Sequence, residues 1–412
     1  MIGPPEGSPR VVLAGGDERA VAIAPAAVPL TPAESLRQNL FSSWWNGALT
    51  IGAGLLVGYL GQALLRWALV TADWDVVAAN LRLFMIGRFP VAEAWRIWAA
   101  TYLIAVLAGA SWAASGARLR WTPSLIALRA IAAAATLAFL LFLLDGLRIW
   151  VLLVGLGAAV GLGVAIGRAG ARRLVRPLLI GWAASFPVVI VLLVGFGGVP
   201  PQRWGGLVLN LLVAVVGIFA SFPVGILLAL GRRSALPAIQ LASVGLIEFV
   251  RGAPLYIWLL FGEFVLPFML PAGLDLPRIV RAMIVVTLFS SAYVAEIVRG
   301  GLQGVHHGQY EAGRALGLST TRLMGLVVLP QALRNTIPAL IGHFISLFKD
   351  TSLLAVIGFI DALRIARISP QGVFQGDLKQ TLLFAALLFW IVAFSMSRWS
   401  QRLERRLGVG ER

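Results

Sequence analysis

Cysteine is absent from this 412-residue chain, and charged residues are scarce. Without cysteine there is no disulfide, no thiolate-ligated zinc or iron–sulfur cluster and no thiol catalysis. Only 13% of the residues are charged and 59% are hydrophobic, whereas soluble domains have about 25% charged and about 45–50% apolar residues. The composition therefore excludes a series of ordinary soluble domains and predicts a protein surrounded largely by lipid.

Acidic residues and lysine are also few. The chain has 18 Asp and Glu against 34 Lys and Arg, a formal charge of +16, and Lys349 and Lys379 are its only lysines. A basic balance can indicate a nucleic-acid partner, but cytoplasmic loops of membrane proteins also collect Arg and Lys. Because most of the basic residues fall on one side of the topology predicted below, no nucleic-acid partner is needed to explain the charge.

Long apolar runs alternate with short polar joints from about residue 45 onward. A helix needs ~20 residues to cross ~30 Å of hydrocarbon, and the every-second-residue alternation of a membrane β-barrel is not seen. We therefore predict an all-α integral membrane protein with both termini on the Arg-rich, cytoplasmic side. The candidate spans are 46–70, 95–114, 125–144, 149–167, 177–197, 206–230, 240–263, 279–300, 335–358 and 381–397.

The first residues differ from the rest of the chain. Six of the 21 prolines lie between Pro4 and Pro32, among glycines, alanines and scattered charges. This composition predicts a disordered or loosely attached cytoplasmic tail over 1–44. The remaining chain divides into N-terminal membrane helices at 45–200, a membrane core at 201–400 with a cytoplasmic loop at 301–334, and a basic cytoplasmic tail at 401–412.

The cytoplasmic loop contains a short predicted helix. Good helix formers run from Glu311 to Leu316, and Gly317 then supplies a stop. A second helix would begin at a cap on Ser319 or Thr320 and end at Pro330. The first helix is either an ordinary amphipathic surface helix or a docking element, because its small residues would let a partner approach the backbone.

The spacing within this loop resembles the EAA loop of ABC importer permeases. Glu311-Ala312-Gly313 is followed by three residues and Gly317, then by nine residues and Val327-Val328-Leu329-Pro330. Gly313 stands where the pattern has its second alanine and Val327 where it has isoleucine, and the spacing is intact. The match spans about twenty residues in the compartment where such a loop belongs.

Other segments extend the resemblance to the polar-amino-acid uptake branch of these permeases over about residues 205–400. They are Arg251-Gly252-Ala253-Pro254-Leu255, Ala292–Gly301, Gly308–Glu311, Pro330–Arg334 and Lys349-Asp350-Thr351-Ser352-Leu353. The additional N-terminal helices and the stretch 266–271 are most similar to the M-type permease subunit of general L-amino-acid ABC transporters.

The resemblance implies a type I ABC transporter transmembrane domain, with a five-helix core preceded by about five additional helices. The implied function is a permease subunit of an ATP-driven, binding-protein-dependent importer of L-amino acids in the bacterial inner membrane. Its implied partners are a second homologous permease, a cytoplasmic ABC ATPase dimer and a periplasmic amino-acid-binding protein. The residues implied to couple to the ATPase are Gln309, Tyr310, Glu311, Ala312, Gly313, Ala315, Leu316 and Gly317.

Among the charges inside predicted spans, where charge is costly and functional by default, three are candidates for a role in transport. Lys349 lies ~21 Å from the cytoplasmic end of its run and Arg251 ~16 Å from the end of its own, with Asp350 beside the lysine. A cation would suit the carboxylate of an amino acid, and Asp350 or carbonyls freed by Pro254 would suit its ammonium. The pathway candidates are Arg251, Pro254, Lys349, Asp350, Thr351 and Ser352. The alternative, equally supported by the sequence, is that the three charged residues form ion pairs between helices.

Three other polar residues receive structural explanations. Glu296 is expected to partner Arg299 or the loop, since it lies near a helix end. His306 and His307 are adjacent, but no third ligand stands at matching spacing, so loop polarity is favoured over a metal site. We therefore predict no metal site and no catalytic residue.

Two other functions were weighed against ATP-driven import. An ion-coupled secondary transporter would show an internal repeat and several intramembrane acids, and an intramembrane enzyme would need a nucleophile–base or metal constellation; neither pattern is apparent. The chain also lacks the Gly-x-x-x-x-Gly-Lys-Ser/Thr phosphate loop. We therefore expect no enzyme activity and no cofactor in this chain, with ATP and Mg²⁺ held by a partner.

Overall fold

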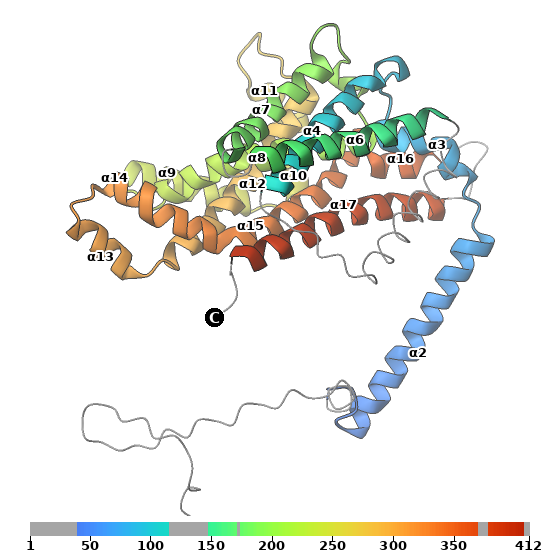
Figure 1. Cartoon of the computed structure of the whole chain (residues 1–412), viewed down its shortest axis with the longest axis horizontal. Coiled ribbons are helices and arrows are strands. Elements are labelled where there is room, and N and C mark those ends of the chain that lie inside the picture. Colours follow the sequence, from blue (N-terminus) through green and yellow to red (C-terminus); the bar gives the residue numbers. More distant parts are fainter. Residues whose placement is uncertain (1–38, 115–146, 171–173, 370–377, 408–412) are drawn as a thin grey trace, which may run out of the picture. The chain divides into compact units, whose positions relative to one another are not determined.

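The computed structural model describes residues 39–114, 147–170, 174–369 and 378–407 (Figure 1). The chain divides into two compact units, Met1–Ala72 and Asp73–Arg412. The described part of the first unit is dominated by α2 (Trp44–Arg66), which continues through a π-helical turn, η1 (Trp67–Thr71). Ser43 caps this helix by accepting a hydrogen bond from the backbone N–H of Asn46. Residues 1–38 of the predicted tail at 1–44 and the predicted span 125–144 lie outside the described residues.

The second unit is helical throughout its described part, apart from one isolated bridge between Gly206 and Asp361. Its α-helices are α3 (Asp75–Ile86), α4 (Ala94–Ala114), α6 (Leu147–Gly170), α7 (Val175–Val194), α8 (Gly206–Gly231), α9 (Pro237–Arg251), α10 (Leu255–Leu260), α11 (Leu266–Met269), α12 (Arg278–Gln303), α13 (His307–Ala315), α14 (Thr320–Leu323), α15 (Leu329–Asp350), α16 (Ala362–Ile368) and α17 (Leu378–Leu407). Shorter turns are η2 (Val91–Glu93), η4 (Pro201–Arg203), η5 (Phe261–Val265), η6 (Met324–Val328) and η7 (Thr351–Ala355).

Six helices of the described residues are long and apolar enough to cross a membrane, or seven if one bent pair counts as a span. They confirm the predicted runs 46–70, 95–114, 206–230, 279–300, 335–358 and 381–397. The runs 149–167 and 177–197 form α6 and α7, but their described apolar stretches, Val154–Ala169 and Ile180–Val194, are shorter than a full crossing. The described structure therefore has fewer spans than the apolar runs predict.

The candidate span at 240–263 is broken, as expected from Pro254. Helix α9 ends at Arg251, and the chain turns by 100° before α10 begins at Leu255. Pro254 is extended (φ −63°, ψ 150°) and has no N–H to continue the helix. The Trp258 indole then donates to the carbonyl of Val250, one of the groups that the break frees (2.8 Å). Arg251 is the last residue of α9 and therefore lies at the break.

The core of the second unit forms where α12 packs between α8 and α15. Glycines set this close approach: a Cβ on Gly225 of α8 would lie 2.5 Å from Val294 of α12, and one on Gly301 would lie 2.7 Å from the carbonyl of Ala332 on α15. Close glycine contacts are typical of helices packed in membranes. The result is a tightly packed centre of three helices, and several charged and polar side chains project from these helices.

Candidate functional site

Helix α13 is the short helix that the sequence predicts. His306 caps its start, accepting from the Gly308 N–H (3.1 Å), and it ends at a left-handed Gly317 (φ +74°). The N–H of Leu318 donates to the carbonyl of Gly313 (3.1 Å), which closes the turn. Because an αL residue with such hydrogen bonds is a common helix stop and favours glycine, the predicted helix stop at Gly317 is confirmed.

Polar contacts and one close packing contact hold α13 in place. The amide of Gln331 on α15 donates to Gln309 (3.1 Å), and the Tyr310 hydroxyl donates to the carbonyl of Leu302 at the end of α12 (3.5 Å). Gly313 is buried against the side chain of Leu323 on α14. One side of α13 is therefore anchored to the ends of two long helices.

The other side of α13 is open. The side chain of Glu311 is 70% exposed and meets His307 through one hydrogen bond (3.1 Å), and Leu316 is 81% exposed. Ala312 and Ala315 are exposed as well. This side of α13 is therefore accessible in the described part of the chain.

The expectation that Pro330 ends the second helix of the loop is wrong. Helix α14 runs through the π-helical turn η6 into α15, so Pro330 lies in the first turn of α15. A proline there removes no hydrogen bond that an α-helix would make. The second helix of the loop and the membrane helix are thus one continuous helical element from Thr320 onward.

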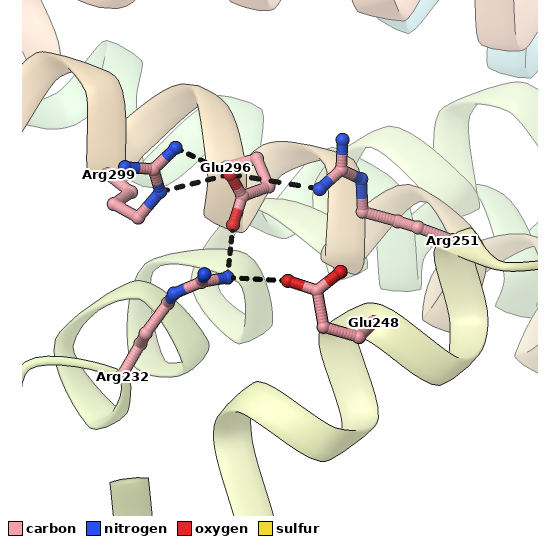
Figure 2. A network of polar contacts seen from close by, with 5 residues as sticks. All are labelled: Arg232, Glu248, Arg251, Glu296 and Arg299. Carbon is pink, nitrogen blue, oxygen red and sulfur yellow. Dashed lines mark hydrogen bonds and ion pairs between the residues drawn. The ribbon is translucent and has the colours of Figure 1, made fainter. Parts of the chain in front are cut away.

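Figure 2 shows a charged cluster, the Glu296 network, which joins α8, α9 and α12. Glu296 is 16% exposed and accepts hydrogen bonds from Arg232 (2.6 Å) and from Arg299 (3.0 Å to Nε), and its other contact is Arg251 (3.7 Å). Arg232 also reaches Glu248 (3.2 Å). The predicted pairing of Glu296 with Arg299 is confirmed, and Arg251 takes part in an inter-helix ion pair.

The structure separates the predicted pathway residues into two groups. Arg251 and Pro254 lie at the break between α9 and α10, whereas Lys349 to Ser352 lie where α15 becomes η7. Within the described residues no ion pair involves Lys349 or Asp350. Lys349 is exposed and Asp350 is half-buried. These two charges are therefore available to a ligand or partner, unlike Arg251.

Thr351 is held by a buried polar cluster that sequence reasoning missed. Its hydroxyl donates to the carbonyl of Phe348 and accepts from the Asn210 amide (3.2 Å), which also donates to Asp361 (3.2 Å). Asp361 caps α16 through the N–H of Arg364 (2.9 Å). Burial raises the pKa of Asp361 to about 6, although these hydrogen bonds lower it. No local signal reveals this cluster, because Asn210 and Asp361 are 151 residues apart.

A second missed feature is a hydrogen-bonded chain across three helices. His343 on α15 lies 2.9 Å from the hydroxyl of Ser290 on α12, which donates to Ser221 on α8 (2.8 Å). Both serines are fully buried. The available signal was a lone histidine inside a predicted span, where ionisable residues are rare.

Comparisons with known proteins agree with this architecture. A family model described as the binding-protein-dependent transport system inner membrane component matches residues 221–409. The chain is 37% identical to the inner membrane amino-acid ABC transporter permease protein YhdY of Escherichia coli K12, over 91% of this chain and 93% of that protein. It is 34% identical to the glutamate/glutamine/aspartate/asparagine transport system permease protein BztC of Rhodobacter capsulatus, over 93% and 96%.

Among solved structures, the chain is similar to a crystal structure of an amino acid ABC transporter with histidines. The identity is 31%, the match covers 48% of this chain and 91% of that one, and the TM-score is 0.44. The two full-length relatives, rather than this partial match, identify the chain. It belongs to the family of amino-acid ABC transporter permeases, multi-pass inner membrane proteins with the type I transmembrane fold.

Proposed function

We propose that this chain lines one half of an amino-acid pathway and that an ATPase drives its conformational change through contact with α13. The observation that carries the proposal is the two-sidedness of α13: one side is fixed by Gln331 and Leu323, and the other presents Glu311 and Leu316 to a partner. A cytoplasmic ABC ATPase dimer is the partner, and a second homologous permease completes the pathway. A periplasmic binding protein delivers the amino acid.

The continuity of the loop with α15 supports rigid-body coupling. A force applied to α13 passes through Leu323 and Gln331 into the element that runs from Thr320 to Ala355. That element carries Lys349 and Asp350 near its far end. Movement of the ATPase would therefore tilt α15 against α12 without any chemistry in this chain. We propose accordingly that the chain is not an enzyme, that it binds no cofactor, and that its termini face the cytoplasm.

The substrate class is inferred from the charges of two residues and from the name of a related permease. Lys349 and Asp350 offer one positive and one negative group without a protein partner in the described structure, which suits the carboxylate and the ammonium of an amino acid. The name of BztC gives glutamate, glutamine, aspartate and asparagine for that relative. We propose polar L-amino acids of this kind as the substrates here.

Reconstitution of the complete transporter in proteoliposomes tests the proposal. Glu311→Lys should lower both amino-acid uptake and the stimulation of ATP hydrolysis by the loaded binding protein at least tenfold. The matched control is Asp275→Lys, which reverses an exposed acid in the joint between α11 and α12 and should leave ATPase association unchanged. Normal uptake and normal stimulation in Glu311→Lys would refute the role of α13.

A further inference from the structure

The hydrogen bonds around His343 have a defined direction. Ser221 donates to the carbonyl of Ile218 (3.3 Å), and Ser290 donates its single hydroxyl hydrogen to Ser221 (2.8 Å). The nitrogen of His343 that faces Ser290, Nε2, must then be the donor in their contact (2.9 Å). A neutral imidazole carries one hydrogen, so Nδ1 is left as an acceptor.

The acceptor nitrogen is uncovered. Nδ1 makes no hydrogen bond within the described part of the chain. It is not fully buried, and the histidine as a whole is half-buried. A Cβ on the neighbouring Gly342 would meet no atom within 4 Å. Because an unpaired polar group facing hydrocarbon is costly, this side of α15 faces water, a ligand or a polar partner.

Neighbouring side chains make the same surface polar and rigid. The ring of Tyr293 on α12 stacks on His343 (5.6 Å between centroids, 13° between planes), and the Arg251 guanidinium lies over the Tyr293 ring (5.4 Å). Asp350 follows His343 by seven residues, two turns farther along the same face of α15 and about 10 Å away. The imidazole is thus held in orientation between a predicted ammonium site and a cation.

We propose that His343 is a specificity-determining contact of the transport pathway that selects carboxamide side chains, those of glutamine and asparagine, over carboxylates. The inference rests on the proposed function. An acceptor nitrogen fixed by Ser290 receives the N–H of a side-chain amide, whereas a carboxylate brings only acceptors and leaves Nδ1 unpaired. Sites built around such a hydrogen bond reject the analogue that lacks its donor.

The test is equilibrium binding of radiolabelled glutamine and glutamate to the permease–ATPase complex in nanodiscs without the binding protein. The wild type should prefer glutamine, and His343→Leu should reduce the glutamine-to-glutamate ratio about tenfold. Ser290→Ala, which releases the tautomer, should reduce the ratio less, and His343→Gln should retain part of it. Ser395→Ala, which removes a hydroxyl from α17 that donates to Ile391, should retain all of it.

The ratio is measured within each variant, so a lower yield of folded complex does not change it. An unchanged ratio in His343→Leu, or no preference in the wild type, overturns the inference while leaving amino-acid transport intact. If the purified His343→Leu complex loses the sister permease while the ratio is unchanged, His343 is a residue of the subunit interface. That result also overturns the inference. Failure of the wild-type transporter to take up any amino acid overturns the proposed function itself.

Discussion

The side chain of Leu323 on α14 fills the space that a Cβ on Gly313 of α13 would need. Glycine at this position, where the loop pattern of related permeases has alanine, lets Leu323 pack against the backbone of α13. It also places a packing contact, rather than a polar one, on the route between the proposed ATPase surface and the membrane.

Enlarging Gly313 should therefore disturb coupling in proportion to side-chain size. Gly313→Ala meets only the flexible end of Leu323 and should be tolerated, whereas Gly313→Val should cost about 1–3 kcal/mol of packing energy and lower ATP-driven uptake. Thermal unfolding and uptake assays measure the two effects. Gly325→Val is the control, since a Cβ there meets nothing within 4 Å, and an equal loss in that variant would contradict the packing account.

Substitutions of Gly317 should follow backbone preference rather than size. At φ +74°, asparagine is tolerated best among non-glycine residues, alanine costs roughly 1–2 kcal/mol, and a β-branched valine is strained further. Uptake should fall in the order Asn, Ala, Val, with Gly317→Asp also impaired by the negative charge that it adds to the exposed surface of the loop. Uptake by Gly317→Val at the wild-type level would show that the turn has no role.

The two acids of the Glu296 network, Glu296 and Glu248, should differ in how much they stabilise the folded protein. Glu296→Gln leaves Arg232, Arg251 and Arg299 without their shared, largely buried carboxylate and should destabilise the complex by about 2 kcal/mol, below the cost of breaking a fully buried pair. Glu248 is 57% exposed, so Glu248→Gln should cost less than about 1 kcal/mol. Thermal unfolding in detergent compares them, and equal losses would contradict the assignment.

Asp361 should make stability depend on pH in a defined direction. Its pKa is about 6 in the folded chain against the ordinary value of 3.8, so the folded state holds the proton more tightly. The stabilisation is complete below pH 3.8 and is lost as the pH rises through 6, up to roughly 3 kcal/mol.

Asn is also a good helix cap, so Asp361→Asn should remove this pH-dependent term without unfolding α16. The measurement is thermal unfolding of wild type and variant between pH 4 and 7. The wild type should lose stability relative to the variant over that range, and parallel curves would show that Asp361 titrates at its ordinary pKa.

Local sequence patterns predicted those parts of the structure that depend on neighbouring residues. Apolar run length identified α8, α12 and α17, and the glycine after a short helical stretch identified the end of α13. The same reasoning erred at Pro330, and at Pro254 it predicted the break but not its angle. Pro254 carries a local signal for a break, but the 100° turn depends on how α10 packs, and Pro330 is accommodated because a π-helical turn precedes it.

Contacts between distant segments were beyond that reasoning. The Asn210–Asp361 hydrogen bond joins residues that are 151 positions apart in the sequence, and the Ser290–His343 hydrogen bond joins residues that are 53 positions apart. Each of these polar residues appears isolated in an apolar run until the helices are packed. That the described residues offer Lys349 and Asp350 no ion pair is likewise a property of the packed helices.

The most direct measurement of the central claim is site-specific cross-linking to the ATPase. The chain has no cysteine, so Glu311→Cys introduces the only thiol, and Asp275→Cys provides a matched exposed control. A bifunctional thiol–amine reagent should join Cys at 311 to the ATPase with a yield that changes on ATP binding, and should not join Cys at 275. Cross-linking from both positions alike, or from neither, would contradict the claim that α13 is the surface on which the ATPase acts.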